Sequence, residues 1–395
     1  MWDRLSTRSL VVCNGVVYTP SSVIEDGAIF VKEGKIEKVG SRTEISDEDL
    51  ETIDAQGQLI CPGFIDLQVN GGGGAFLTED GNYESVCRIA KTHLSFGTTT
   101  LMPTVITAHE KQIRAALSAV GDAVRKGTGT ASIIGSHLEG PFINEKMKGA
   151  HDERYVLPPS VDQFSSFYEA SQGTLRLLTM APELPGSLSL MEHATAMGLT
   201  VSIGHTTATF SEVERAVEAG ATMATHIFNA MEGLGNREPG TVGAILSIDK
   251  LRTGLIADGI HVHPMSMKVC IQAKGVEKVF LVTDAMPPAG TSMTSFRLYD
   301  KQIYVKERGL YDLDGTIAGS TLTMNRAVKV IQELVGIPLQ KAIAMATINP
   351  AVAVGIDSLK GSLQAGKDAD MVICDPQLNV SKVLVRGRVA YDAAS

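Results

Sequence analysis

Eight short apolar runs, most of them followed by a helix-like segment, constrain the fold of this chain more than any other feature. Strands are predicted at 59–67, 98–105, 131–138, 175–181, 199–204, 221–225, 251–257 and 278–283, and helices between them at 83–96, 109–126, 188–197, 210–219 and 264–274. Strands that alternate with helices form parallel βα units, and eight such units close into a (β/α)8 barrel. An open doubly wound sheet is the alternative, but no G-x-G-x-x-G follows the first strand.

The two ends of the chain share a different pattern, in which apolar runs alternate with glycine turns. These runs lie at 9–18, 27–40, 366–374 and 383–391. Neither end has enough strands to bury a stable sheet face alone. We therefore predict a small β-sandwich domain built from residues 1–58 plus 359–395, and a barrel over 59–358. Residues 285–318 are predicted to form an irregular β-rich excursion, with helices near 321–335 and 338–346.

Composition narrows the classes of function. A chain of 395 residues suits a barrel of about 250 residues plus a smaller module. A net charge of −9 argues against nucleic acid or an anionic membrane as the main partner. The sequence shows no transmembrane stretch and no signal peptide, and its five scattered cysteines lack a C-x-x-C pair. The expected location is the cytoplasm, with buried thiols in a reducing compartment.

Acidic and histidine residues close four of the predicted strands. Glu139, His205 and His226 close the third, fifth and sixth strands, and Asp284 closes the eighth. Because parallel barrels bring the C-terminal ends of their strands to one mouth, these side chains are expected to meet there. A lone residue of this kind is more often structural, and Asp284 could instead cap a helix. Together, the four predict a three-ligand divalent metal site with a general base beside it, typical of a metal-dependent hydrolase.

Six short segments carry a more specific pattern. They are Pro62-Gly-Phe-Ile-Asp66, Leu138-Glu-Gly-Pro-Phe142, Ile203-Gly-His-Thr206, His226-Ile-Phe-Asn-Ala-Met231, Ala257-Asp-Gly-Ile-His261 and Val282-Thr-Asp-Ala285. In these segments the chain resembles the N-acetylglucosamine-6-phosphate deacetylase family of the amidohydrolase superfamily, and the resemblance runs nearly end to end. The first segment indicates only the superfamily, whereas the second and fourth are specific to these deacetylases. The resemblance implies hydrolysis of N-acetylglucosamine 6-phosphate to glucosamine 6-phosphate and acetate.

The first barrel strand departs from the superfamily pattern. Gln68 and Asn70 stand where most members have His-x-His, which binds a second metal ion. Amide side chains are poor ligands for Zn²⁺. Some members of the deacetylase family resemble this chain here and use one metal. We therefore expect each subunit to bind one divalent ion, expected to be Zn²⁺, with Glu139, His205 and His226 as its ligands. Gln68 is expected to hydrogen-bond the metal's water or the substrate carbonyl, or only to pack at the strand end.

The resemblance also implies roles for single residues. Asp284 would act as general base and then acid, and His261, rather than His263, would steady the carbonyl oxygen of the tetrahedral intermediate. Arg237 would bind the phosphate, in some members across a dimer interface, and a homodimer is expected. Further substrate contacts are implied for Ala150, His151, Asn229, Ala230, Asp258, Ile317, Ala318 and Gly319. His93, His109 and His193 lie in predicted helices and are expected at the surface, and His137 has no assigned role.

Two other interpretations stay open. One is a deacetylase of another N-acetylated amino sugar phosphate, such as the galactosamine epimer, because a sequence does not distinguish the direction of one hydroxyl. The other is an assembly protein on the amidohydrolase fold without catalysis, which the loss of His-x-His favours. The presence of Glu139, His205, His226 and Asp284 argues against that second interpretation.

Overall fold

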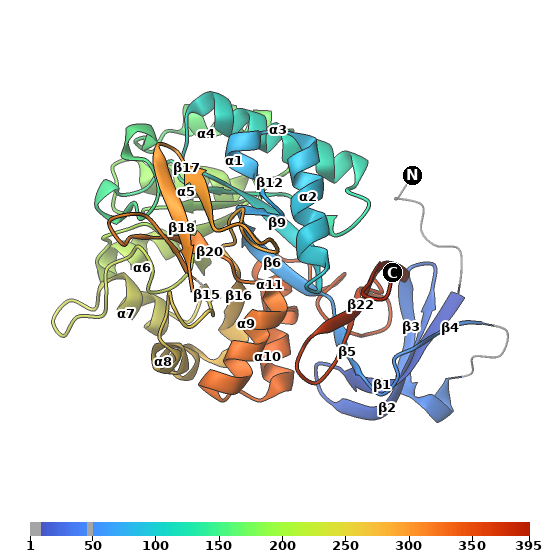
Figure 1. The fold of residues 1–395 in the computed structure, drawn as a ribbon. Coiled ribbons are helices and arrows are strands. Elements are labelled where there is room, and N and C mark those ends of the chain that lie inside the picture. The colour runs from blue at the N-terminus through green and yellow to red at the C-terminus, as the bar shows by residue number, and fades with distance from the viewer. Residues whose placement is uncertain (1–8, 46–49, 308) are drawn as a thin grey trace.

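A parallel barrel forms the body of the protein, as the computed structural model shows for residues 9–45, 50–307 and 309–395 (Figure 1). Within these residues its strands are β6 (Phe64–Val69), β9 (Thr98–Ile106), β11 (Ser136–Glu139), β12 (Leu175–Met180), β13 (Thr200–Ile203), β14 (Met223–Ala224), β15 (Arg252–Ile256) and β16 (Val279–Val282). The order runs from β9 through β11 to β16, with β6 beside β9. The ring closes where Asp284 N donates to Gln68 O at 2.9 Å and Asn70 N donates to Ala285 O at 3.0 Å. The predicted eight-stranded barrel is confirmed.

Two of the predicted strands are each divided in the structure. The run at 59–67 consists of β5 (Leu59–Pro62), which pairs with β1 and β21 at the chain ends, and β6, which pairs in the barrel. The run at 131–138 consists of β10 (Ser132–Ile133) and β11, with Gly135 between them. Gly135 has a positive φ of 141°, and a Cβ there would lie 2.4 Å from Cγ of Arg176. Glycine therefore permits a bend that the apolar pattern does not reveal.

Helices surround the barrel (Figure 1). They are α1 (Leu77–Asp80), α2 (Tyr83–Leu94), α3 (Glu110–Lys126), α4 (Val161–Ala170), α5 (Ser187–Ala196), α6 (Phe210–Glu218), α7 (Gly240–Ser247), α8 (Pro264–Lys274), α9 (Met324–Val330), α10 (Leu339–Met345) and α11 (Ile348–Ala353), with 3₁₀ turns η1 (Arg42–Glu44), η2 (Glu145–Met147), η3 (Glu153–Tyr155) and η4 (Val276–Lys278) and a π turn η5 (Ile331–Val335). The predicted helices lie within about two residues of α2, α3, α5, α6 and α8, because their caps are local: Thr209 and Glu212 form a reciprocal capping box at α6. The helices predicted near 321–335 and 338–346 correspond to α9 with η5 and to α10, whereas α1, α4, α7 and α11 were not predicted.

The barrel strands are buried on both faces. All nine residues of β9 and all four of β16 are buried, because side chains fill the barrel and helices cover its outside. None of the helices in the described parts of the chain has the length and apolar character needed to cross a bilayer.

A separate sheet joins the two chain ends. Its strands are β1 (Ser9–Tyr18), β2 (Val23–Lys32), β3 (Lys35–Ser41), β4 (Glu51–Asp54), β5, β21 (Met371–Cys374), β22 (Val380–Val385) and β23 (Arg388–Asp392). Strand β5 lies between β1 and β21, so the ends share one sheet with its own core, which includes Ile29, Ile60 and Ile373. The terminal β unit is confirmed, and the exact domain boundaries at 58/59 and 358/359 stay a prediction.

The excursion after β16 is more regular than expected. It forms a four-stranded antiparallel sheet of β17 (Ser295–Leu298), β18 (Lys301–Lys306), β19 (Gly309–Tyr311) and β20 (Ile317–Ser320). Near β6, the strands β7 (Gly71–Gly72) and β8 (Ala75–Phe76) form a small hairpin. The Tyr299 hydroxyl donates to Thr107 O after β9, and Arg154 pairs with Asp300 at 2.6 Å. The insert is therefore held against the loops at the barrel mouth.

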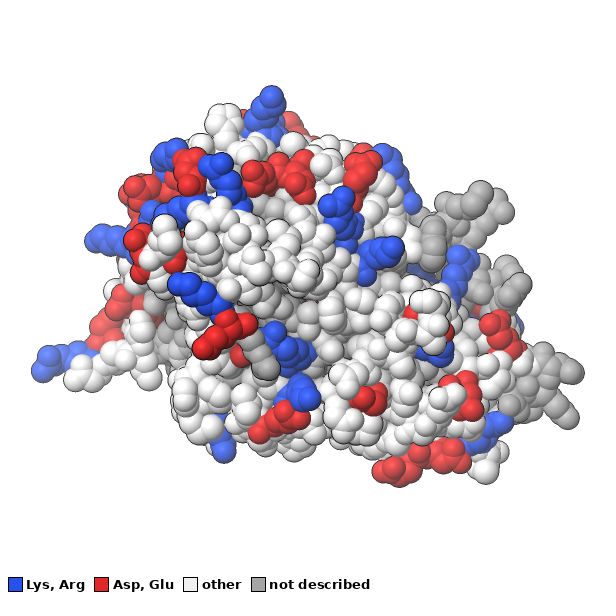
Figure 2. Space-filling model, in the orientation of Figure 1, with Lys and Arg blue, Asp and Glu red and all other residues white. Residues whose placement is uncertain are grey.

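On one face of the protein, the charged side chains that the structure describes do not form a single patch (Figure 2). On the face drawn in Figure 2, basic and acidic side chains of the described residues are interspersed around a broad uncharged area. The exclusion of nucleic acid as the main partner rests on the net charge of −9 and stays a prediction.

Candidate metal and catalytic site

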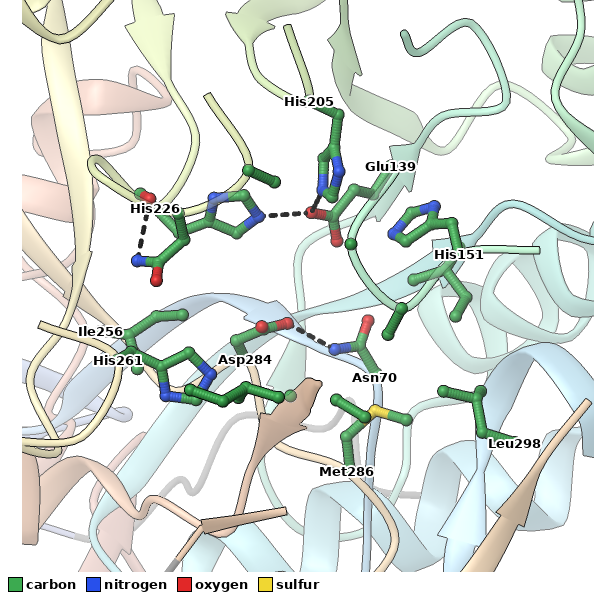
Figure 3. A pocket seen from close by; sticks show the side chains of 18 residues that line it. Asn70, Glu139, His151, His205, His226, Ile256, His261, Asp284, Met286 and Leu298 are labelled. Atoms are coloured by element: carbon green, nitrogen blue, oxygen red, sulfur yellow. Dashed lines mark hydrogen bonds and ion pairs between the residues drawn. The ribbon is translucent and has the colours of Figure 1, made fainter. Parts of the chain in front are cut away.

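The four residues singled out at the strand ends meet at the barrel mouth (Figure 3). Glu139 is the last residue of β11, and His205, His226 and Asp284 each lie two residues beyond β13, β14 and β16. These three have positive φ values of 50°, 29° and 50°. Residues other than glycine rarely adopt this backbone region, and such strain concentrates at functional sites. The same turn at three strand ends directs all three side chains to one point.

Glu139 and the two histidines converge on a single oxygen. Nε2 of His205 lies 3.1 Å from Oε1 of Glu139, and Nε2 of His226 lies 3.0 Å from the same atom. All three side chains are buried. Tetrahedral Zn²⁺ with bonds of about 2.1 Å holds its ligand atoms roughly 3.4 Å apart. The donor set and its spacing therefore fit one divalent ion.

The protonation of these groups also suits a metal site. Burial alone would raise the pKa of Glu139, but hydrogen bonds from His205 and His226 outweigh it and hold the pKa well below the usual range. Nδ1 of His205 lies 2.8 Å from Met147 O and can donate its proton to this oxygen, so loss of the Nε2 proton would leave a lone pair on Nε2 for a metal ion. Nδ1 of His226 is buried without a hydrogen-bond partner among the described residues.

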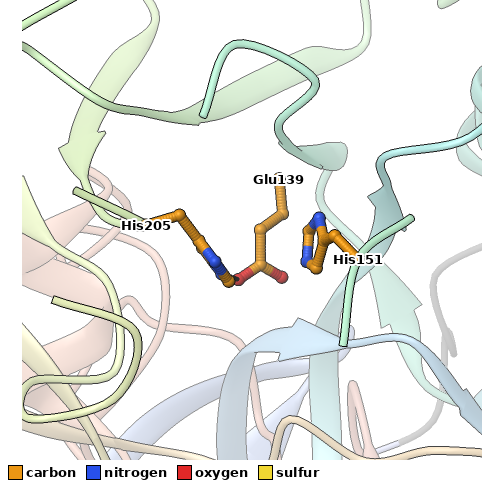
Figure 4. Close-up of side chains that lie close together, drawn as sticks. All are labelled: Glu139, His151 and His205. Carbon is orange, nitrogen blue, oxygen red and sulfur yellow. Dashed lines mark hydrogen bonds and ion pairs between the residues drawn. The ribbon is translucent and has the colours of Figure 1, made fainter. Parts of the chain in front are cut away.

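His151 lies beside the same carboxylate (Figure 4). One ligand atom from each of Glu139, His151 and His205 lies within 4.8 Å of the others. Nδ1 of His151 is 2.8 Å from Oγ1 of Thr107, and burial, with the nearby His205, lowers the pKa of His151 to about 3. The ring is therefore neutral at neutral pH. His151 was predicted only as a substrate contact, and its place beside the ligands depends on the loop after β11, which no strand pattern reveals.

Asp284 faces two amides from the end of β6. Asn70 Nδ2 donates to Oδ1 of Asp284 at 2.6 Å, and Gln68 Nε2 lies 3.3 Å from the same oxygen. Gln68 Nε2 also donates to both oxygens of Glu139, at 2.9 and 3.0 Å. Burial and the Glu139 charge raise the pKa of Asp284 to about 6. A carboxyl group with this pKa is suited to exchanging protons near neutral pH.

His261 is oriented by a neighbouring carboxylate. Its Nδ1 lies 2.6 Å from Oδ2 of Asp258, whose Oδ1 accepts from the backbone N–H groups of Ile260 and His261 at 2.8 and 2.9 Å. Burial would raise the pKa of Asp258, but the hydrogen bond with His261 lowers it overall. His263 instead caps α8, where its side chain accepts from Met265 N. The structure thus separates the two histidines as the sequence predicted.

These side chains surround a cavity of about 190 Å³. The predicted substrate contacts that line it are Ala150, His151, Asn229, Ala230, His261, Ile317, Ala318 and Gly319. Gly319 has a positive φ of 74°, and a Cβ there would meet Cγ of Met286 at 2.4 Å, so glycine is required. The sequence did not reveal the apolar wall of Ile106, Met286 and Leu298. Hydrophobic residues on separate strands and loops form no sequence pattern that would identify the wall of a cavity.

Three predicted residues lie outside this lining. Asp258 reaches the cavity only through His261, and Gln68 lies behind Glu139 and Asp284. Arg237 is exposed on the loop between β14 and α7. Arg237, the predicted phosphate ligand, is therefore not among the described residues that line the cavity of its own chain.

Two other histidines have structural environments. His93 was expected at the surface, and this was wrong: it is fully buried, with Nε2 2.9 Å from Gly71 O, because the glycine loop folds over α2. His137 lies inside the barrel, between Oγ1 of Thr104 at 3.3 Å and Oγ1 of Thr179 at 2.7 Å. Burial lowers its pKa to about 4, so it is a neutral member of a hydrogen-bonded layer below the mouth.

Comparisons with known proteins agree with this site. The family model described as the amidohydrolase family matches residues 59–390. An N-acetylglucosamine-6-phosphate deacetylase of Haemophilus influenzae is 35% identical over 95% of this chain and 97% of its own. An N-acetylgalactosamine-6-phosphate deacetylase of Escherichia coli O157:H7 is 35% identical over 84% of this chain and 88% of its own. The crystal structure of N-acetylglucosamine-6-phosphate deacetylase from Pasteurella multocida superposes with a TM-score of 0.91 at 34% identity, covering 96% and 99% of the two chains.

The barrel and the cluster of histidines around Glu139 at its mouth define a member of the metal-dependent amidohydrolases. Within this class, the chain belongs to the N-acetylglucosamine-6-phosphate deacetylase family.

Proposed function

We propose that this protein hydrolyses the acetamide of N-acetyl-D-glucosamine 6-phosphate, giving D-glucosamine 6-phosphate and acetate in amino-sugar catabolism. The observation that carries this proposal is the convergence of His205 and His226 on Oε1 of Glu139, at 3.1 and 3.0 Å. Asp284 stands at the same mouth, which leads into a cavity lined by the segments shared with the family. The relatives are deacetylases of N-acetylated amino sugar 6-phosphates, and this activity supplies the substrate class.

The cofactor we propose is one Zn²⁺ ion per chain on Glu139, His205 and His226. A divalent ion held there supplies Lewis-acid polarisation of the amide carbonyl and lowers the pKa of a water molecule. One carboxylate and two imidazoles form a ligand set that occurs in catalytic zinc sites. The assignment of zinc rests on this ligand chemistry.

Asp284 is the proposed general base and acid. Its carboxylate would take a proton from the attacking water and return it to the departing amine. A pKa of about 6 leaves the group mostly ionised at pH 7, while keeping it basic enough to accept a proton. Asn70 holds its Oδ1 at 2.6 Å, so the carboxylate is already oriented before substrate binds.

Two histidines would contact the substrate. His261, with Nδ1 fixed by Asp258 at 2.6 Å, has Nε2 left to steady the carbonyl oxygen as charge develops on it. His151, a neutral ring beside Glu139, would be a second contact next to the metal ligands. Asn229, Ala230 and the backbone of Ile317–Gly319 line the remainder of the cavity and would bind the sugar.

The phosphate is proposed to bind Arg237, whose guanidinium can donate two parallel hydrogen bonds to it. Because Arg237 is exposed and is not among the described residues around its own cavity, we propose that it reaches the cavity of a second subunit in a homodimer. The partners are thus a phosphorylated amino sugar and a second copy of the chain. A cytoplasmic location stays a prediction from the sequence.

A second candidate substrate is the galactosamine epimer. It is favoured by the 35% identity to N-acetylgalactosamine-6-phosphate deacetylase, which equals the identity to the glucosamine enzyme of Haemophilus influenzae. The test is release of acetate from both 6-phosphates and from unphosphorylated N-acetylglucosamine. We expect the highest kcat/KM on N-acetylglucosamine 6-phosphate; a preference for the galactosamine epimer would replace the first substrate, and no acetate from any of them would refute the deacetylase assignment.

A further inference from the structure

Two amide side chains contact the carboxylates of the site. Gln68 Nε2 donates to Oε1 and Oε2 of Glu139 at 2.9 and 3.0 Å and lies 3.3 Å from Oδ1 of Asp284. Asn70 Nδ2 donates to the same Asp284 oxygen at 2.6 Å. One amide thus connects both carboxylates, and the other contacts only Asp284.

The position of these amides follows from the strand geometry. Residues two apart on a strand face the same side, so Gln68 and Asn70 both face the barrel mouth from the end of β6. The backbone holds them there: Gln68 O accepts from Asp284 N at 2.9 Å, and Asn70 N donates to Ala285 O at 3.0 Å. The amides and Asp284 therefore belong to one rigid junction between β6 and β16.

The contact with Asp284 fixes the orientation of Asn70. Because its Nδ2 bonds a carboxylate, its Oδ1 must face the other way. Asn70 also lines the cavity, so its side chain lies between Asp284 and the space proposed for the substrate.

The electrostatics of the mouth explain why such a bond is useful. Two buried carboxylates, Glu139 and Asp284, share one amide donor at this mouth, and like charges at a partly dehydrated mouth repel each other. A second cation would offset this repulsion. Amide N–H groups offset part of it as fixed dipoles, while amides remain poor metal ligands.

We propose that Gln68 and Asn70 are positioning residues that take the place of a second cation, with Gln68 holding the metal ligand Glu139 and the base Asp284 together and Asn70 orienting Asp284 alone. The proposal deepens the proposed function, since it assumes a single metal and an Asp284 base. It predicts different effects for the two amides, because only Gln68 contacts the metal ligand.

The test compares Gln68→Met and Asn70→Leu, which keep side-chain size and remove the donors. Metal affinity is measured by chelator competition, and kcat and KM are measured on N-acetylglucosamine 6-phosphate. We expect Gln68→Met to weaken metal binding by about 10–100-fold and to lower kcat. Asn70→Leu should keep the wild-type metal affinity within about twofold and KM within about threefold, while kcat falls by about 10–100-fold.

Gln340→Met is the matched control. It removes an amide that donates to Thr19 O at 2.9 Å, on α10 and outside the lining of the site. Its metal affinity and kcat should match the wild type. If Gln68→Met or Asn70→Leu does not fold, Gln68→Asn and Asn70→Ser replace them, since both keep a donor but draw it back, and the same pattern is expected in weaker form.

The outcomes are distinct. Wild-type metal affinity in the folded Gln68 variant, or a KM that rises as much as kcat falls in the Asn70 variant, would overturn the proposal. The chelator titration uses no substrate, so it tests Gln68 even if the wild-type protein releases no acetate. A wild-type protein that releases no acetate would refute the proposed function, but it would not contradict the proposed role of Gln68 in metal binding.

Discussion

Oε1 of Glu139 lies 3.0 Å from Nε2 of His226, although 87 positions separate the two residues in the chain. Glu139 ends β11, and His226 follows β14 with a positive φ of 29°. The contact arises because parallel strands converge at the barrel mouth. A metal ion between these atoms needs only a small adjustment of the side chains, since the separation is already close to that of tetrahedral ligands.

We predict one divalent ion per chain. Metal analysis of the purified protein should give about one metal ion per chain. Glu139→Gln should lower this metal content, because it removes the anionic carboxylate that both histidines face. Treatment with a chelator should abolish acetate release, and added Zn²⁺ should restore it. Two ions held with comparable occupancy would contradict the single-metal arrangement.

Asp284→Asn should leave the fold and metal content intact while turnover collapses. Asparagine keeps the volume of the side chain but cannot accept a proton, and general acid–base catalysis typically contributes about 10²–10⁴-fold. The measurement is kcat alongside metal content. A variant with near-normal kcat would show that another group is the base.

The rate should also fall at low pH. Burial and Glu139 raise the pKa of Asp284 to about 6, so protonation removes the base as the pH drops through that value. A bound cation favours the ionised carboxylate and moves this limb to lower pH. We therefore expect log kcat/KM, measured on the metal-loaded protein, to decline at or below about pH 6. Circular dichroism shows the pH range over which the protein stays folded. Full activity within that range at a pH where Asp284 is protonated would exclude its role as the base.

Arg237→Ala should raise KM sharply for the 6-phosphate sugar, while hardly changing the poor hydrolysis of the unphosphorylated sugar. The reason is the loss of charge-assisted hydrogen bonds to the phosphate. If Arg237 acts across a dimer, dilution below the dimer affinity should raise KM in the same way. Equal loss on both substrates would mean that Arg237 holds its loop and not the phosphate.

Stability should depend on a buried ion cluster near the terminal sheet. Lys360 Nζ lies 2.8 Å from Asp368 and 2.6 Å from Asp370, and all three side chains are buried. Lys360→Met removes a cation from two buried carboxylates, of which Asp368 keeps Lys35 at 2.7 Å, so the free energy of unfolding should fall by roughly 3 kcal/mol, the lower end of the range for a broken buried pair. Lys329→Met, which breaks the exposed pair with Glu333 at 3.8 Å on the surface of the barrel, is the control and should cost less than about 1 kcal/mol. Urea unfolding of both variants checks the difference, and equal effects would contradict it.

The local signals in the sequence predicted the barrel well. Apolar runs, helix caps such as Thr209 with Glu212, and the residues that close the strands depend on near neighbours in the chain. The sequence therefore indicated which strands exist and that Glu139, His205, His226 and Asp284 would face one mouth. It did not indicate that the run at 59–67 divides between two sheets, because both halves are equally apolar.

The sequence by itself determined the class of fold and the chemical identity of the site, because hydrophobic period and side-chain type are local properties. Only the tertiary structure decided what each polar group contacts. Gln68 faces two carboxylates, His151 stands beside Glu139, and His93 is buried against Gly71 O. These contacts join elements distant in sequence, and their geometry is set by barrel closure and loop packing, which no local pattern encodes.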